Sequence, residues 1–272
     1  MAVQPNPSYQ IRKFRFRRLK NKTIQWWRLL SNPANSKEFH SMELSWAWEP
    51  TYREGAWSSD SSKRSLRCVY NWNMGRWSKA KRNSTTDWFW RFVFMEGNNR
   101  GGGLALYWWN SIDLSIDTFS KNHIDAIINK RKKDSWRFTG FYGDPVTHKR
   151  FESWNVLHQL NKRFCLPWLC AGDFNEIVQS SEKLRGSNRS QNQMQLFKDA
   201  IDKCGFIDMG FEGSPYTWQK HFADRHSIWE RLDRVLVAND WLLKFLGTKI
   251  HHLSSDSLYH CPFWNVLVDW ML

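Results

Sequence analysis

Residues 167–175 read Pro-Trp-Leu-Cys-Ala-Gly-Asp-Phe-Asn, so an apolar run passes directly into a glycine, a carboxylate and an amide. A short apolar run bounded by turn residues predicts a buried strand. Because loops at the end of a sheet gather functional groups, Asp173 and Asn175 are the first candidate site residues. The alternative is that Asp173 only caps a turn, since Gly-Asp is a common turn sequence.

The segments around this strand alternate between strand and helix periodicity. Period-two alternation and short apolar runs predict strands, whereas apolar residues three or four apart predict amphipathic helices. We expect strands at residues 103–109, 112–116, 123–128, 136–142, 167–171, 216–218, 228–237, 250–253 and 263–268, and helices at 146–164, 191–204 and 239–246. This order indicates an α/β protein in which two sheets pack face to face between helices.

Positive charge is concentrated in the first third of the chain. The 272 residues carry a net charge of +14, and residues 1–100 hold 19 Lys and Arg against 7 Asp and Glu. Residues 11–20 (IRKFRFRRLK) interleave aromatic side chains with cations, a pattern that grips phosphates and stacks on bases. We expect residues 1–40 to form a basic, disordered arm that binds nucleic acid. The alternatives are that these residues form a nuclear localisation signal or a solvated tail.

Other features restrict the class of protein. No apolar run reaches the roughly 18 to 20 residues that span a membrane, and the first 20 residues lack the apolar core of a secretory signal. The five cysteines form no C-x-x-C pair and no metal-ligand spacing, which is typical of reduced thiols. We therefore expect an intracellular protein, nuclear if the arm is an address, with no membrane partner.

Residues 41–95 have an unusual composition. Seven of the 19 tryptophans fall between Trp46 and Trp90, and we find no helical or strand period there. We therefore expect residues 41–95 to be a divergent start of a domain that continues through residues 96–270.

Two further candidate site residues lie in or beside predicted strands. Asp233 lies within the charged segment Glu-Arg-Leu-Asp-Arg (230–234), and His260 precedes Cys-Pro. Asp, Asn and His side chains at neighbouring strand ends can position a water, stabilise phosphate charge and move a proton. The alternatives are that Asp233 pairs with Arg231 or Arg234 at the surface, and that His260 is a half-buried strand histidine.

A series of motifs in a fixed order carries more information than any one residue. They are Arg100 to Leu106 (RGGGLAL), Trp136 to Gly143 (WRFTGFYG) with Pro145, Pro167 to Glu176 (PWLCAGDFNE), Gln193 to Phe197 (QMQLF), Cys204 to Asp208 (CGFID), Gly213 to Trp218 (GSPYTW), Glu230 to Arg234 (ERLDR) and His260 to Pro262 (HCP). Over residues 96–263 this series resembles the endonuclease/exonuclease/phosphatase family, and within it the endonucleases of non-LTR (LINE-type) retrotransposons.

The resemblance implies a fold, a reaction and partners. It implies a four-layer α/β sandwich, two packed mixed sheets flanked by helices, and cleavage of a DNA phosphodiester bond that depends on Mg²⁺ or Mn²⁺. DNA is then the expected partner, and a reverse transcriptase region would follow in the ancestral polyprotein.

The resemblance also implies roles for five residues. Asp173 would position or deprotonate the attacking water, Asn175 would support the phosphate, and Tyr142 would lie on the phosphate side. Asp233 would orient the catalytic histidine, His260, as in other His–Asp pairs. Whether Asp173 or His260 accepts the proton stays open.

Three residues of the family pattern are absent. The family's opening strand ends in Ser-Trp-Asn, but here Ala47 follows Trp46; no Glu-Thr appears between residues 47 and 95; and Tyr259, not Asp, precedes His260, with Asp256 three positions too early. A hard cation would lose its oxygen ligands. One shifted reading frame would turn the codons of three places within residues 47–94 into family-like sequence, so we hypothesise a decayed or wrongly read frame there.

These observations lead to one functional prediction and two alternatives. We predict a retrotransposon-derived endonuclease domain whose ancestral DNA-nicking activity is impaired and whose N-terminal strands are missing or degraded. The alternatives are a non-catalytic nucleic-acid-binding protein that uses the basic arm, and a family phosphatase.

Overall fold

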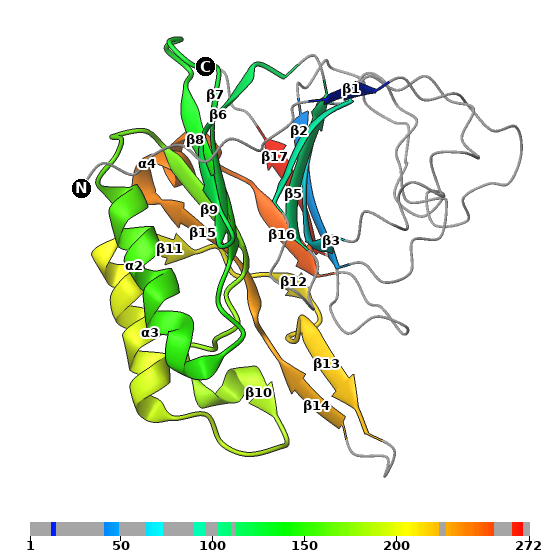
Figure 1. Ribbon diagram of the computed structural model, residues 1–272, viewed down its shortest axis with the longest axis vertical. Coiled ribbons are helices and arrows are strands. Elements are labelled where there is room, and N and C mark those ends of the chain that lie inside the picture. Colours follow the sequence, from blue (N-terminus) through cyan, green and yellow to red (C-terminus); the bar gives the residue numbers. More distant parts are fainter. Residues whose placement is uncertain are drawn as a thin grey trace, which may run out of the picture.

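The computed structural model describes residues 112–222, 227–252 and 263–268, together with strands at 12–14, 41–48, 64–72, 90–95 and 103–109. Two large sheets pack face to face, and helices lie on the outer side of one of them (Figure 1). A small third sheet projects from one end of the pair.

The six-stranded sheet carries most of the predicted site residues. Only β8 and β9 run parallel in it, because α2 connects them as a crossover, and the other neighbours are antiparallel. Its order is β11 (Phe206–Asp208), β15 (Asp233–Ala238), β9 (Trp168–Asp173), β8 (Trp136–Tyr142), β7 (His123–Ile128) and β6 (Leu114–Ser120).

The eight-stranded sheet contains the N-terminal strands. Its order is β1 (Arg12–Phe14), β4 (Trp90–Met95), β5 (Gly103–Trp109), β3 (Arg64–Trp72), β2 (Ser41–Trp48), β17 (Phe263–Val268), β16 (Lys249–His252) and β12 (Glu212–Gly213). The three-stranded sheet consists of β10 (Lys183–Leu184), β14 (Ser227–Glu230) and β13 (Trp218–His221).

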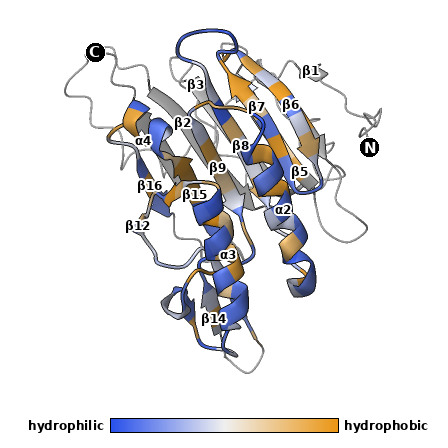
Figure 2. Cartoon of the chain, turned by 90° about the vertical axis from the view of Figure 1, so that its left-hand side faces the viewer, coloured by the Kyte–Doolittle hydropathy of each residue, from blue (hydrophilic) through white to orange (hydrophobic). Residues whose placement is uncertain are grey.

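Two long helices cover the outer face of the six-stranded sheet (Figures 1 and 2). They are α2 (Arg150–Asn161), preceded by a 3-10 turn at Thr147–Lys149, and α3 (Gln191–Lys203); α4 (Asn239–Lys244) is short, and a second 3-10 turn lies at Ser180–Glu182. Among the described residues no helix covers the outer face of the eight-stranded sheet, so these residues form three of the four expected layers. Nor is any helix in this part of the chain long and apolar enough to cross a membrane.

Two apolar cores hold the layers together. Alternate residues of each strand point to opposite faces, so one strand contributes to both cores. The core between the sheets includes Leu104, Leu106, Ala126, Phe138, Leu169 and Val235, with Trp241 of α4. The core under the helices includes Phe141, Trp154, Leu157, Cys170, Phe197 and Leu236.

A buried ion pair crosses the helix side of the six-stranded sheet. Arg137 donates from Nε and Nη2 to the Asp125 carboxylate at 2.9 to 3.1 Å, and both side chains are fully buried. The remaining Arg137 nitrogen donates to the carbonyl oxygen of Leu160 at the end of α2. Because each buried charge has a fixed partner, this pair ties α2 to the centre of the sheet.

Most predicted elements are confirmed, and β5, β7, β8 and β17 have the predicted bounds. The segment at 228–237 was predicted as one strand and is instead two strands in different sheets, β14 and β15. The break lies at Arg231 and Leu232, where the chain leaves the small sheet.

The structure contains strands in the region where the N-terminal strands were expected to be missing or degraded. β2 pairs in register with β17 and β3, and β4 with β5. The physical reason is a period-two alternation that the tryptophan-rich composition obscured: Met42, Leu44, Trp46 and Trp48 alternate with other residues. Apart from β1, residues 1–40 lie outside the described residues. The basic arm, the boundaries at 40 and 95 and the shifted frame stay predictions.

Candidate functional site

Three of the predicted site residues lie side by side at one edge of the six-stranded sheet. Tyr142 ends β8, Asp173 ends β9, and Asp233 begins the antiparallel strand β15. Asp173 is the Cα partner of both Tyr142 and Asp233. Neighbouring strands are about 4.8 Å apart, so the three side chains share one short edge.

A close backbone contact fixes the turn that follows β9. The amide of Gly143 donates to the carbonyl oxygen of Asp173 at 2.7 Å. A Cβ at Gly143 would lie 2.2 Å from the carbonyl oxygen of Phe174, so only glycine fits there. Asn175 has a φ of 55°, in the left-handed region that asparagine tolerates better than most residues.

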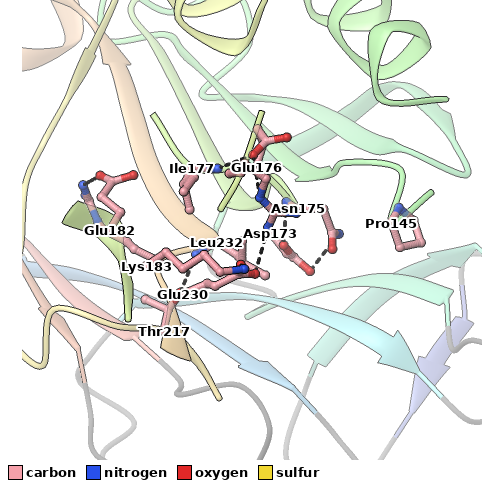
Figure 3. A network of polar contacts seen from close by, with 12 residues as sticks. Pro145, Asp173, Asn175, Glu176, Ile177, Glu182, Lys183, Thr217, Glu230 and Leu232 are labelled. Carbon is pink, nitrogen blue, oxygen red and sulfur yellow. Dashed lines mark hydrogen bonds and ion pairs between the residues drawn. The ribbon is translucent and has the colours of Figure 1, made fainter. Parts of the chain in front are cut away.

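Asn175 holds the Asp173 carboxylate in place (Figure 3). Its backbone N–H donates to Oδ1 of Asp173 at 2.8 Å, and its side-chain Nδ2 donates to Oδ2 at 3.0 Å and to the carbonyl oxygen of Gly143 at 3.0 Å. Asp173 is almost fully buried. The N–H bond to Oδ1 is the turn cap that a Gly-Asp sequence favours, and the side-chain bond to Oδ2 fixes the second oxygen of this buried carboxylate.

Tyr142 keeps its proton at neutral pH. Burial raises the pKa of its phenol well above the usual value, and the charge of Asp173 adds to the effect, while a hydrogen bond with the Asn175 side chain acts in the opposite direction. A phenol that stays protonated can donate a hydrogen bond to an anion at this edge.

The third residue, Asp233, is held through its backbone. The buried Thr217 hydroxyl accepts hydrogen bonds from the N–H groups of Leu232 and Asp233, at 3.0 and 2.9 Å. The N–H of Phe174 donates to the carbonyl oxygen of Leu232 at 2.9 Å. The segments that carry Asp173 and Asp233 are thus bonded to each other and to the GSPYTW segment.

The arginines beside Asp233 pair elsewhere, so the surface-pairing interpretation is wrong. Arg231 binds Glu182 and Asp208 at 3.0 and 2.7 Å, and Arg234 also binds both of these carboxylates. Both arginines are buried, as is Asp233. The two cations hold the pKa of Asp208 below its usual value, although burial acts in the opposite direction.

A buried histidine lies close to this edge at a position that the sequence did not single out. His260 is outside the described residues, so its hydrogen bond to Asp233 stays a prediction. His252 of β16 has its Nδ1 2.7 Å from the carbonyl oxygen of Ser214, which requires a proton on that nitrogen, and its ring stacks on Phe211 at 4.5 Å. Burial lowers the pKa of His252, although the charge of Asp233 acts to raise it.

The described residues do not complete a metal site. Asp173, Asp233 and Asn175 supply oxygen atoms of the kind that Mg²⁺ prefers. In the described part of the chain, however, no three His, Cys, Asp or Glu side chains gather as a metal would require. Ala47 lies on β2 opposite Val69, and Asp256 and Tyr259 lie outside the described residues.

The fold and this edge define a two-sheet α/β sandwich with an acidic, tyrosine-bearing site at the strand ends. Residues 28–256 match the Endonuclease/Exonuclease/phosphatase family, and the chain belongs to that family. Its members generally depend on a divalent metal. No curated protein matches the chain by sequence.

Solved structures share the fold at low sequence identity. The endonuclease domain of TRAS1, a telomere-specific non-LTR retrotransposon, is 11% identical with a TM-score of 0.56, over 83% of this chain and 98% of that one. The AP endonuclease LMAP from Leishmania major is 13% identical with a TM-score of 0.59, over 93% of each chain. The 3' phosphatase NExo from Neisseria, bound to a product DNA hairpin, is 14% identical with a TM-score of 0.57, over 84% and 100%.

The sequence prediction missed several residues that support this edge. Thr217, Glu176 and Glu230 lie within predicted motifs, yet their contacts come from residues far away in the chain. His252 and Arg189 lie outside the motifs. His252 is buried and Arg189 is partly buried, and the sequence does not reveal burial.

Proposed function

We propose that this chain is a retrotransposon-derived endonuclease domain that acts on the phosphodiester backbone of DNA, and that its metal-dependent nicking is impaired. The observation that carries the proposal is the cross-strand pair of Asp173 and Asp233, with Tyr142 as the next Cα partner of Asp173. A phosphodiester hydrolase needs a carboxylate to position water and a donor for phosphate oxygens.

The contacts support the roles of Asp173 and Tyr142, whereas the roles of Asp233 and Asn175 are carried over from the family motif. Asp173, fixed by Asn175 through both oxygens, positions or deprotonates the attacking water. Tyr142, protonated, donates to a phosphate oxygen. Asp233 orients His260, as predicted from the family motif, and Asn175 supports the phosphate.

DNA as the substrate rests on two kinds of support. The fold is shared with an AP endonuclease and with a 3' phosphatase bound to a DNA hairpin. The motifs WRFTGFYG and ERLDR resemble those of non-LTR retrotransposon endonucleases, and the TRAS1 domain has the same fold. These motifs favour an endonuclease over a family phosphatase of small phosphoesters.

The impairment follows from the side chains that stand where the family places cation ligands. Ala47, Tyr259 and the missing Glu-Thr motif remove three polar groups, whereas Asp173, Asn175 and Asp233 remain. Changing one residue that only supports a metal ligand already lowers metal affinity or activity about 10–100-fold. Loss of the ligands themselves should cost more.

The test is relaxation of supercoiled plasmid with Mg²⁺ or Mn²⁺, using three proteins. The first is the chain as it stands; the second has residues 47–94 rewritten in the shifted frame with the family Asn and Glu and Tyr259→Asp; the third adds Asp173→Ala to the second. We expect nicking from the second protein only. Nicking by the first protein would refute the impairment, nicking by the third would refute the role of Asp173, and a second protein that folds but does not nick would refute the endonuclease assignment.

A non-catalytic role in nucleic-acid binding is the second candidate, because 19 of the 40 Lys and Arg residues lie in the first hundred. It predicts DNA binding that does not depend on sequence, survives His260→Ala and weakens steeply between low and physiological salt.

A further inference from the structure

Two motif carboxylates, Glu176 and Glu230, are not explained by the proposed reaction. Glu176 follows Asn175 directly, and Glu230 lies three residues before Asp233. Both side chains are buried, at 1% and 7% exposure. A buried carboxylate is costly unless cations or other donors surround it, so their partners indicate their purpose.

The partners form a continuous chain of ion pairs. Arg150 Nη1 lies 2.6 Å from Glu176 Oε2, and Arg189 Nε lies 3.1 Å from Glu176 Oε1. Arg189 Nη2 donates to Glu230 Oε2 at 2.8 Å, and Lys183 Nζ donates to Glu230 Oε1 at 2.6 Å. Arg189 therefore stands in the middle and contacts both carboxylates.

Arg189 connects segments that are far apart in the sequence. It lies two residues before α3, whereas Glu176 belongs to the turn after β9 and Glu230 is the last residue of β14. Figure 3 shows Glu176 and Glu230 on either side of Asp173 and Leu232. Each glutamate is close in sequence to a residue of the proposed site: Glu176 follows Asn175, and Glu230 precedes Asp233 by three residues.

We propose that Arg189 is a positioning residue: its guanidinium bridges Glu176 and Glu230 and thereby sets the turn that carries Asp173 and Asn175 against the segment that carries Asp233. The effect on catalysis rests on the proposed function, whereas the bridge itself does not. Arginine suits this position because its planar group presents several donors at fixed angles, whereas a lysine ammonium is a single point charge.

The surroundings show why one substitution would loosen the site without unfolding the protein. Each carboxylate keeps a second cation when Arg189 is removed, Arg150 for Glu176 and Lys183 for Glu230. Neither becomes an unpaired buried charge. The substitution removes only the side chain that contacts both carboxylates. We therefore expect the mobility of the Glu176 segment and of the Glu230 segment to rise together.

The test compares Arg189→Met with the wild-type full chain by amide hydrogen exchange. Peptides over residues 173–178 and 227–233 report the two segments, and a peptide over β7 reports the rest of the sheet. We expect exchange in both segments to rise at least about tenfold, with β7 unchanged, because Arg189 loses a charged hydrogen bond to Glu230 and an ion-pair contact with Glu176 whose angle is not that of a hydrogen bond. Arg163→Met is the matched control, because Arg163 pairs with Asp117 at 2.8 Å but is 43% exposed.

Further variants separate bridging from charge and from folding. Arg189→Lys should exchange nearly as fast as Arg189→Met, because one ammonium does not bond both carboxylates in this geometry. If Arg189→Met fails to fold, Glu230→Gln provides a second test. It removes the carboxylate charge at one end of the series of ion pairs, and we then expect faster exchange at 173–178. Wild-type exchange in Arg189→Lys, or a rise confined to one segment, would overturn the bridge.

A second readout links the bridge to the reaction. In the repaired chain described above, Arg189→Met should lower the nicking rate at saturating DNA about tenfold or more, since small displacements of reacting groups are costly, while DNA affinity stays the same. A repaired chain that does not nick at all would count against the proposed function alone, because the exchange experiment decides the bridge independently.

Discussion

Replacing Thr217 with Val should destabilise the protein because of two backbone hydrogen bonds. The substitution keeps the shape of the side chain but removes the hydroxyl that accepts from the N–H groups of Leu232 and Asp233. Thr217 is fully buried, so water cannot easily take its place. Leaving a buried donor unsatisfied costs about 1–3 kcal/mol, so we expect the free energy of unfolding to fall by about 2–4 kcal/mol after partial relaxation.

The assay is urea unfolding followed by tryptophan fluorescence, with the midpoint compared at constant slope. Thr217→Ser is the control: it keeps the hydroxyl and loses one methyl group, which costs about 1 kcal/mol. Thr217→Val should be clearly less stable than Thr217→Ser. If the two variants unfold at the same urea concentration, the hydroxyl does not hold the Asp233 segment, and the account of that segment is wrong.

Three further predictions concern the sheet around the site. Arg137→Met should lower the free energy of unfolding by about 3–5 kcal/mol, because it leaves the buried Asp125 unpaired; adding Asp125→Leu should recover part of this in thermal melting, and no recovery would contradict the pairing argument. Gly143→Ala should lower the melting temperature more than Gly205→Ala, because a Cβ at Gly143 meets backbone at 2.2 Å whereas nothing lies within 4 Å at Gly205, where only the φ of 64° is strained; equal effects would contradict it. Burial, and then the charges of Arg137 and Arg163, lower the pKa of His123 to about 4, so the stability from its neutral form is present above about pH 6.5 and is lost as the pH falls toward 4; His123→Gln should flatten urea midpoints over that range, and an unchanged slope would contradict it.

The sequence predicted those elements whose periodicity is local and clean. β7 alternates polar and apolar residues from His123 to Ala126, and β8 leads into glycine and a turn, so both strands were placed correctly. The meeting of Tyr142, Asp173 and Asp233 was also predicted, from the family resemblance of their motifs, although Asp233 was expected inside a strand over 228–237 and not at the start of one. His260 lies outside the described residues and stays a prediction.

What the sequence did not reveal depends on contacts between distant residues. The partners of Arg189 lie 13 and 41 residues away, and no local pattern connects them. The alternation in β2 was present but was missed, and the segment was interpreted as a divergent start of the domain because its tryptophan-rich composition was given more weight than its period. The break between β14 and β15 was not predicted because it depends on a contact with a distant residue. The Thr217 hydroxyl that accepts a hydrogen bond from the Leu232 N–H is 15 residues away.

The charged side chains of the ERLDR segment fall into two groups: most form ion pairs with neighbouring loops, and one lies at the edge of the proposed site. Glu230 bonds Lys183 and Arg189, and Arg231 and Arg234 bond Glu182 and Asp208. Three of its four charged side chains therefore hold the loops around the edge, and the fourth, Asp233, lies at the edge itself, opposite Asp173. Removing one partner of a buried ion pair leaves an unpaired buried charge, which is strongly destabilising. If the cation ligands are lost, as proposed, the chain can therefore still keep these supporting residues, because losing one of them would destabilise the fold as well.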